Sequence, residues 1–205
     1  MSDAAFHEPY LAACVRTPFL GCSLRPLSLG HLLLLHSLDS AFVPPIKDPL
    51  FDDLAASVVI CCNTYENALA AIGTPKLKRE LAKWQKELGV FDFAAACEEF
   101  QAYVARGMQE PFHRWCGEGG HEGSTPKAQG VKVTLMHKLG FRESEILDRP
   151  YRLCLLDWFT FHANEGNLSF VTPEEVDSVR EIARMTPEQL DAALAKQKEA
   201  RNGTP

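Results

Sequence analysis

Leucine is most concentrated in one early segment of the chain, which carries its own helix start and helix stop signals. This segment, residues 24–40, reads LRPLSLGHLLLLHSLDS. Ser28 is placed to act as N-cap, because its hydroxyl can accept a hydrogen bond from a free backbone N–H of the first turn. The leucines fall on nearly all sides of a helix, which predicts burial on several faces. The run is about half as long as the roughly 20 residues of a membrane span, so we expect a central helix.

Apolar residues recur at the spacing of a helix face through most of the remaining chain. Residues 1–23 are the exception, and we expect them to be irregular, with one helical turn or short strand near 10–16. The expected later helices cover residues 50–72, 75–88, 92–108, 127–139, 142–148 and 151–165, and two more start at capping boxes at Thr172 and Thr186.

This pattern predicts an all-α fold, a multi-helix globular bundle of about seven to eight helices. We expect residues 1–170 to form a single helical domain with a long, flexible, glycine-rich loop at 109–126. Residues 171–205 are expected to form a C-terminal helical extension with a disordered end. Its last helix is expected to be frayed, because Leu190 and Leu194 are its only large apolar residues.

Charge and composition argue against several classes of protein. The 205 residues include 21 basic and 27 acidic side chains, for a net charge of −6, which argues against a nucleic-acid surface as the main function. The N-terminus, MSDAAFHEPY, lacks the basic flank and apolar segment of a signal peptide, and no window predicts a transmembrane helix. We expect the seven cysteines to be reduced thiols that act as small hydrophobic residues in a cytoplasmic protein.

Pairs of reactive side chains are badly spaced for catalysis or metal binding. His31 and His36 are five residues apart and diverge by about 140° on a helix, so we expect hydrogen-bonded core histidines. Asp157 and His162 have the same spacing, which makes an acid–base pair a poor hypothesis. Adjacent cysteines at 61–62 point about 100° apart, and we expect buried thiols there. Without a catalytic motif, the chain is not expected to be an enzyme.

The glycine-rich loop contains one possible metal-binding set. His113, Cys116 and His121 form H-x2-C-x4-H, with Glu118 or Glu122 as a fourth donor. The spacing matches no strong zinc pattern, and the neighbouring glycines are equally typical of a mobile loop. We therefore expect no cofactor and no metal, and we keep metal binding by this loop as an alternative.

Two stretches resemble a known family. They are residues 24–42, LRPLSLGHLLLLHSLDSAF, and residues 139–175, which run from LGFRESEILDRPYRLCLLDW through NEGNLSFVTPEE. Both are similar to the small all-helical tail assembly chaperones of tailed phages and prophages. The resemblance implies a non-enzymatic protein of the host cytoplasm that coats the helical, amphipathic tape measure protein. It would keep this partner soluble and extended until tail tube subunits polymerise around it.

A chaperone of this kind needs apolar helix surface that a partner helix can cover. We expect this surface on the aromatic helix and the C-terminal extension, with Trp158, Phe161, Leu190 and Leu194 as partner-binding residues. The expected partner is a tape measure protein or tail tube subunits. We expect no binding to nucleic acid or to a membrane. The sequence leaves open whether the chain forms a homo-oligomer. Two alternatives remain, a structural virion protein such as a tail or head–tail adaptor, and a small metal-binding regulatory protein.

Overall fold

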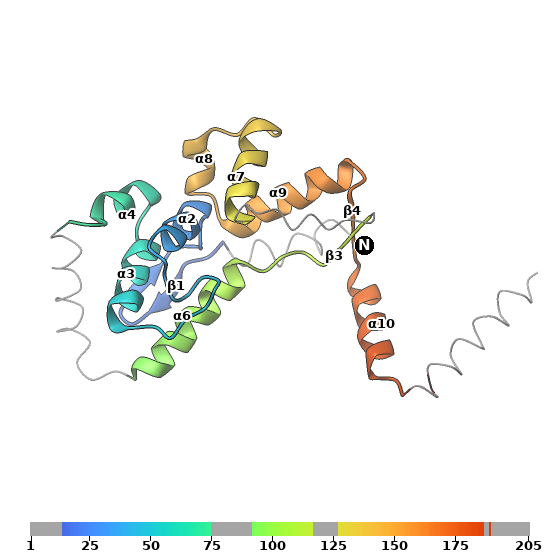
Figure 1. Ribbon diagram of the computed structural model, residues 1–205, viewed down its shortest axis with the longest axis horizontal. Coiled ribbons are helices and arrows are strands. Elements are labelled where there is room, and N and C mark those ends of the chain that lie inside the picture. The colour runs from blue at the N-terminus through green and yellow to red at the C-terminus, as the bar shows by residue number, and fades with distance from the viewer. Residues whose placement is uncertain (1–13, 75–91, 117–126, 187–188, 190–205) are drawn as a thin grey trace, which may run out of the picture.

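The computed structural model describes residues 14–74, 92–116, 127–186 and 189, which contain helices and a few short strands (Figure 1). The helices within these residues are α2 (Leu29–Ser37), α3 (Phe51–Cys62), α4 (Tyr65–Ala71), α6 (Phe93–Gly107), α7 (Lys127–His137), α8 (Glu143–Leu147), α9 (Tyr151–Asn164) and α10 (Pro173–Arg184). The strands are β1 (Thr17–Phe19), β2 (Cys22–Leu24), β3 (His113–Trp115) and β4 (Leu168–Phe170), paired β1 with β2 and β3 with β4, both antiparallel. The predicted all-α class is therefore wrong, and the fold is mixed.

The leucine-rich helix α2 is the centre of the packed body, with α3, α4, α7, α8 and α9 against it (Figure 1). Leu29 and Leu35 are completely buried and Leu32 almost so, which confirms the predicted burial on several faces. The start of α9 is tied to the segment before α2, because the Tyr151 N–H donates to the Leu27 carbonyl at 2.7 Å. In contrast, α6 packs on α3.

The start of α2 is a capping box in which histidine takes the place usually held by glutamate or glutamine. The His31 N–H donates to Ser28 Oγ at 3.1 Å, and the Ser28 N–H donates to His31 Nδ1 at 3.2 Å. On the other side of the ring, Nε2 donates to the Asn63 carbonyl at 2.8 Å. This arrangement fixes a neutral imidazole, and burial lowers the pKa of His31. The expectation of a hydrogen-bonded core histidine is confirmed for His31.

The long helix expected over 50–72 is divided into α3 and α4. Asn63 has extended backbone, and the Thr64 side chain begins α4 by accepting from the Asn67 N–H at 3.4 Å. A distant residue completes this cap, because Asp148 Oδ1 accepts from the Tyr65 N–H at 2.8 Å. The break turns the Asn63 carbonyl toward His31, and this long-range contact is not visible in the helical periodicity of the segment.

The segment 14–23, expected to be irregular, contains β1 and most of β2, which form a hairpin. Leu20 and Gly21 form its two-residue turn with φ of 43° and 74°. Positive φ at both positions is the geometry that makes Asn-Gly the usual sequence of such turns. Leucine at the first position hides that signal. The hairpin buries Phe19 and Leu24 in the core.

The second two-stranded sheet has one strand, β3, within the loop that we expected to be structureless over 109–126. His113 pairs with Phe170 and Trp115 pairs with Leu168, and the ladder continues as the Cys116 N–H donates to the Asn167 carbonyl at 2.8 Å. Three residues are too few to show a strand period, and the partner strand is distant in sequence. Pairing with β4 therefore decides the conformation of β3.

The other predicted helices agree with the structure where it describes them. α6, α7, α8 and α9 match the expected segments, and Asp92 caps α6 by accepting from the Ala95 N–H at 3.1 Å. Reciprocal hydrogen bonds confirm the capping boxes of Thr172 with Glu175 and Thr186 with Gln189. α10 leads away from the packed helices (Figure 1). The helix expected over 75–88 lies outside the described residues. No helix among the described residues is long and apolar enough to cross a membrane.

Candidate functional site

The strands β3 and β4 lie near the C-terminal end of α9 (Figure 1). Aromatic side chains of β3 and α9 contact each other there. We call this group the aromatic surface, and it consists of His113, Trp115, Trp158, Phe161 and His162. The strand contributes two of its members because alternate residues of a strand face the same side. The helix contributes three because residues three and four positions apart are neighbours on one helix face. Two elements far apart in the sequence thus form one continuous face.

Trp115 is the most exposed member of the aromatic surface, with 41% of its area accessible. Its ring meets Trp158 edge-on at a centroid distance of 5.9 Å and His162 at 5.5 Å. The rings of Trp158 and His162 are themselves 4.5 Å apart. These edge-to-face contacts hold the indole of Trp115 in place while leaving much of it open to solvent.

A buried aromatic floor supports this surface. Phe159 is completely buried and its ring centroid lies 4.3 Å from that of His113 and 4.9 Å from that of Trp158. Lys127, at the start of α7, places its ammonium 5.2 Å from the Phe159 centroid and 5.6 Å from that of Trp158. Glu110 forms an ion pair with the same ammonium. The charge of Lys127 is therefore partly matched, and the surface is apolar with one basic edge.

His162 is held as a neutral ring within the aromatic surface. The Asn167 side-chain amide donates to its Nδ1 at 3.4 Å, and burial lowers its pKa, although Glu165 acts in the opposite direction. Asp157 is engaged elsewhere, in an ion pair with Arg149 at 2.8 Å. Burial raises the pKa of Asp157, and the Arg149 guanidinium opposes that rise. The prediction that Asp157 and His162 are no acid–base pair agrees with these separate partners.

Two of the four predicted partner-binding residues lie on the aromatic surface. Trp158 is half-buried at the centre of this surface. The Phe161 ring packs edge-on against that of His162, with the ring centroids 5.3 Å apart. Leu190 and Leu194 lie outside the described residues. The sequence reasoning missed Trp115, the most open member. The alternation of His113 and Trp115 within F-H-R-W was the available signal, but the glycines that follow favoured a loop interpretation.

The predicted metal-binding set is not brought together in the described part of the loop. His113 Nδ1 donates to the Pro111 carbonyl at 2.8 Å, and its ring packs on Phe159. Cys116 is three residues further along extended backbone, so its side chain faces the opposite side of the strand. His121 and the two glutamates, Glu118 and Glu122, lie outside the described residues. Within the described ranges no group of three histidine, cysteine, aspartate or glutamate residues could hold a metal ion.

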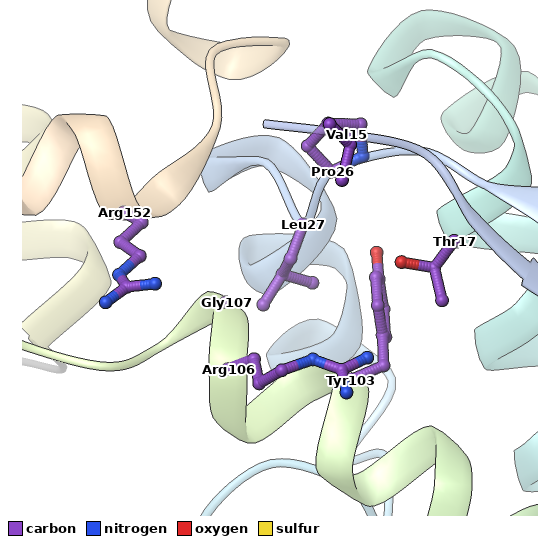
Figure 2. Close-up of a pocket in the computed structure, with 8 residues that line it drawn as sticks. All are labelled: Val15, Thr17, Pro26, Leu27, Tyr103, Arg106, Gly107 and Arg152. Atoms are coloured by element: carbon purple, nitrogen blue, oxygen red, sulfur yellow. The ribbon is translucent and has the colours of Figure 1, made fainter. Parts of the chain in front are cut away.

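A separate cavity of about 250 Å³ opens beside the start of α2 (Figure 2). Its lining residues are Val15, Thr17, Pro26, Leu27, Tyr103, Arg106, Gly107 and Arg152. The Tyr103 hydroxyl donates to the Arg25 carbonyl at 2.8 Å, which fixes one wall. These lining residues supply two guanidinium groups but no carboxylate, histidine or cysteine. The cavity therefore has no general base or thiol nucleophile, and we do not assign a catalytic site there.

Comparison with known proteins gives no match to a family model, to a curated protein or to a solved structure. The function is therefore argued from the geometry of the aromatic surface and from the sequence resemblance.

Proposed function

We propose that this protein is a non-enzymatic tail assembly factor of a tailed phage or prophage that binds a helical partner, the tape measure protein. The observation that carries the proposal is the position of Trp115, fixed by Trp158 and His162 but 41% exposed on an otherwise aromatic face. A large ring held in one geometry can bind a partner without losing much further side-chain entropy. The resemblance of residues 24–42 and 139–175 to tail assembly chaperones supplies the biological context.

The exposed part of Trp115 sets the scale of its contribution to binding. A tryptophan side chain presents about 150–250 Å², so the exposed part amounts to about 60–100 Å². At about 25 cal/mol per Å², complete burial of this area contributes about 1.5–2.5 kcal/mol. That magnitude is typical of a single anchor residue at the centre of a protein interface.

An amphipathic helix is the partner that this surface fits best. Trp158, Phe161 and His162 occupy one face over about one turn of α9, and Trp115 extends that face sideways onto β3. A partner helix laid along α9 would place its own apolar positions at i, i+3, i+4 and i+7 against these rings. Lys127, beside the rings of Trp158 and Phe159, offers a contact for an acidic side chain at the rim of the same interface.

The test is co-expression with the product of a tape-measure-like gene next to the gene of this protein. The wild-type chain should raise the soluble fraction of that product and elute with it in size-exclusion chromatography. Trp115→Ala should weaken the complex roughly 10- to 70-fold in Kd, the equivalent of the burial energy above. Leu69→Ala is the matched control, because Leu69 is a similarly exposed apolar residue on α4.

Two outcomes would contradict the proposal. A gene neighbourhood made of metabolic genes, with no tape-measure-like gene, would remove its biological basis. Equal affinity of wild type and Trp115→Ala, with the variant still folded by circular dichroism, would exclude the aromatic surface as the binding site. Finding the chain as a stoichiometric component of purified particles would instead favour the alternative of a structural tail or head–tail adaptor protein.

The metal-binding regulatory alternative has less support. His113 Nδ1 donates to the Pro111 carbonyl, its ring packs against Phe159, and Cys116 faces the opposite side of the strand. Elemental analysis of the purified protein decides this point, since one zinc per chain would restore the alternative.

A further inference from the structure

Two cysteines that are distant in sequence meet where the β1–β2 hairpin packs against α3. Cys22 is the first residue of β2, and Cys62 is the last residue of α3. A backbone hydrogen bond connects the end of β2 to the end of α3 here, because the Arg25 N–H donates to the Cys61 carbonyl at 2.8 Å. β2, the partner strand of β1, packs against α3. The two thiols therefore come from elements held together by backbone contacts.

The Cys22 and Cys62 side chains contact each other, and each thiol donates one hydrogen bond. The Cys62 thiol donates to the Cys22 sulfur, and the Cys22 thiol donates to the Phe19 carbonyl at 2.8 Å. The hydrogen bond from Cys62 lowers the pKa of Cys22, while the same bond and burial raise the pKa of Cys62. Both residues are partly exposed, so a small reagent can reach them.

We propose that Cys22 and Cys62 form an oxidation site in which a hydroperoxide converts the two thiols into one disulfide between β2 and the end of α3. Cys22 is the attacking residue, because the hydrogen bond from Cys62 stabilises its thiolate. Its sulfur attacks the O–O bond of the peroxide, so that an S–O bond forms, the O–O bond breaks and the departing oxygen takes up a proton. Cys22 is then a sulfenic acid.

Cys62 completes the reaction. Its sulfur attacks the Cys22 sulfur, the S–S bond forms and the S–O bond breaks. The departing hydroxide takes the Cys62 proton and leaves as water. In total the two thiols lose two electrons and two protons, and hydrogen peroxide is reduced to two molecules of water. This inference does not depend on the proposed function, because it uses neither the aromatic surface nor a partner.

The neighbouring cysteines are less suited to this chemistry. Cys61 is completely buried, interacts with the Tyr103 side chain, and has a pKa raised by burial to about 12. Cys97 and Cys154 are also buried, and burial raises the pKa of each. Cys116 is exposed on the β3 side of the molecule. It can be oxidised, but it follows β3 and belongs to neither β2 nor α3.

Peptide mapping of the full chain tests the proposal. The protein is treated with hydrogen peroxide, blocked with N-ethylmaleimide, digested without reduction and analysed by mass spectrometry. We expect one linked pair of peptides containing Cys22 and Cys62, lighter by two hydrogens than the reduced pair. Both residues should lose their N-ethylmaleimide label together, and reduction should restore it.

Single substitutions assign the two roles. In Cys62→Ser the linked peptides should disappear, and dimedone should label Cys22 as a trapped sulfenic acid. Cys97→Ser is the matched control and should oxidise like wild type. The proposal is overturned if Cys22 and Cys62 stay fully labelled by N-ethylmaleimide while Cys116 is oxidised, or if either one is found linked to a different cysteine. Because the wild-type chain alone decides between these outcomes, poor folding of a variant would not affect the conclusion.

Discussion

Replacing His31 by leucine should reduce the free energy of unfolding by about 2–4 kcal/mol at pH 8, because it removes both hydrogen bonds of a buried ring. The His31 side chain is completely buried, and its nitrogens contact the Ser28 N–H at 3.2 Å and the Asn63 carbonyl at 2.8 Å. Leucine has a similar volume and is apolar, so it leaves little cavity. The loss of stability comes from the Ser28 N–H and the Asn63 carbonyl, which lose their hydrogen-bond partner.

The magnitude follows from the exposure of those two partners. Ser28 is buried, so its N–H without an acceptor costs about 1–3 kcal/mol. Asn63 is only partly buried, and water can reach its carbonyl more easily, so we assign about 1 kcal/mol to it. For a chain of this length the total corresponds to a decrease of roughly 4–16 °C in Tm.

His36→Leu is a matched control in the same helix. His36 is half-buried, and its ring makes no hydrogen bond within the described residues. The expected change is therefore within about 0.5 kcal/mol. Urea unfolding followed by circular dichroism at pH 8, where the histidines are neutral, measures wild type and both variants.

The pH dependence of the unfolding free energy provides an independent measurement of the contribution of His31. The pKa of His31 is lowered below the ordinary value of 6.5, so the unfolded chain binds the proton more tightly than the folded chain. The stabilisation from a neutral His31 is complete above pH 6.5 and is lost as the pH falls from there toward the lower pKa of the folded state. The difference in unfolding free energy between wild type and His31→Leu should therefore shrink by at most about 1.4 kcal/mol per pH unit. If His31→Leu and His36→Leu have equal stabilities at pH 8, the argument from the capping box is refuted.

Three further predictions use the same unfolding measurement. Gly30→Ala should destabilise the protein by about 1–3 kcal/mol, because a Cβ there would lie 2.6 Å from the Leu147 carbonyl oxygen and 2.5 Å from the Tyr65 ring. Gly130→Ala, in open space within α7, should instead stabilise it by about 0.5–1 kcal/mol, and a loss of stability would contradict this account. Tyr103→Phe should cost about 1 kcal/mol through the lost hydrogen bond to the Arg25 carbonyl, and an unchanged unfolding midpoint would show that this bond contributes nothing.

Part of the candidate site could be predicted from the sequence. Trp158 and Phe161 follow from the aromatic periodicity of residues 151–165, because helical spacing is a local property. Trp115 could not be predicted in the same way. Its conformation depends on pairing with β4, and the register that places it beside Trp158 is set by contacts between distant segments. The same applies to Cys22 and Cys62, since cysteine spacing along the chain does not show which thiols meet.

The sequence by itself determined most of the helices and their ends. Local signals such as Ser28, Asp92 and Thr172 act within a few residues, so capping and periodicity can be read without knowing the fold. Only the tertiary structure decided the break at Asn63 and the pairing of β3 with β4. At these places the deciding hydrogen bonds and strand pairings come from elements distant in the chain, and local preferences of three-residue strands are too weak to compete. The leucines of α2 thus determine a buried helix, while its contact with Asn63 through His31 belongs to the assembled fold.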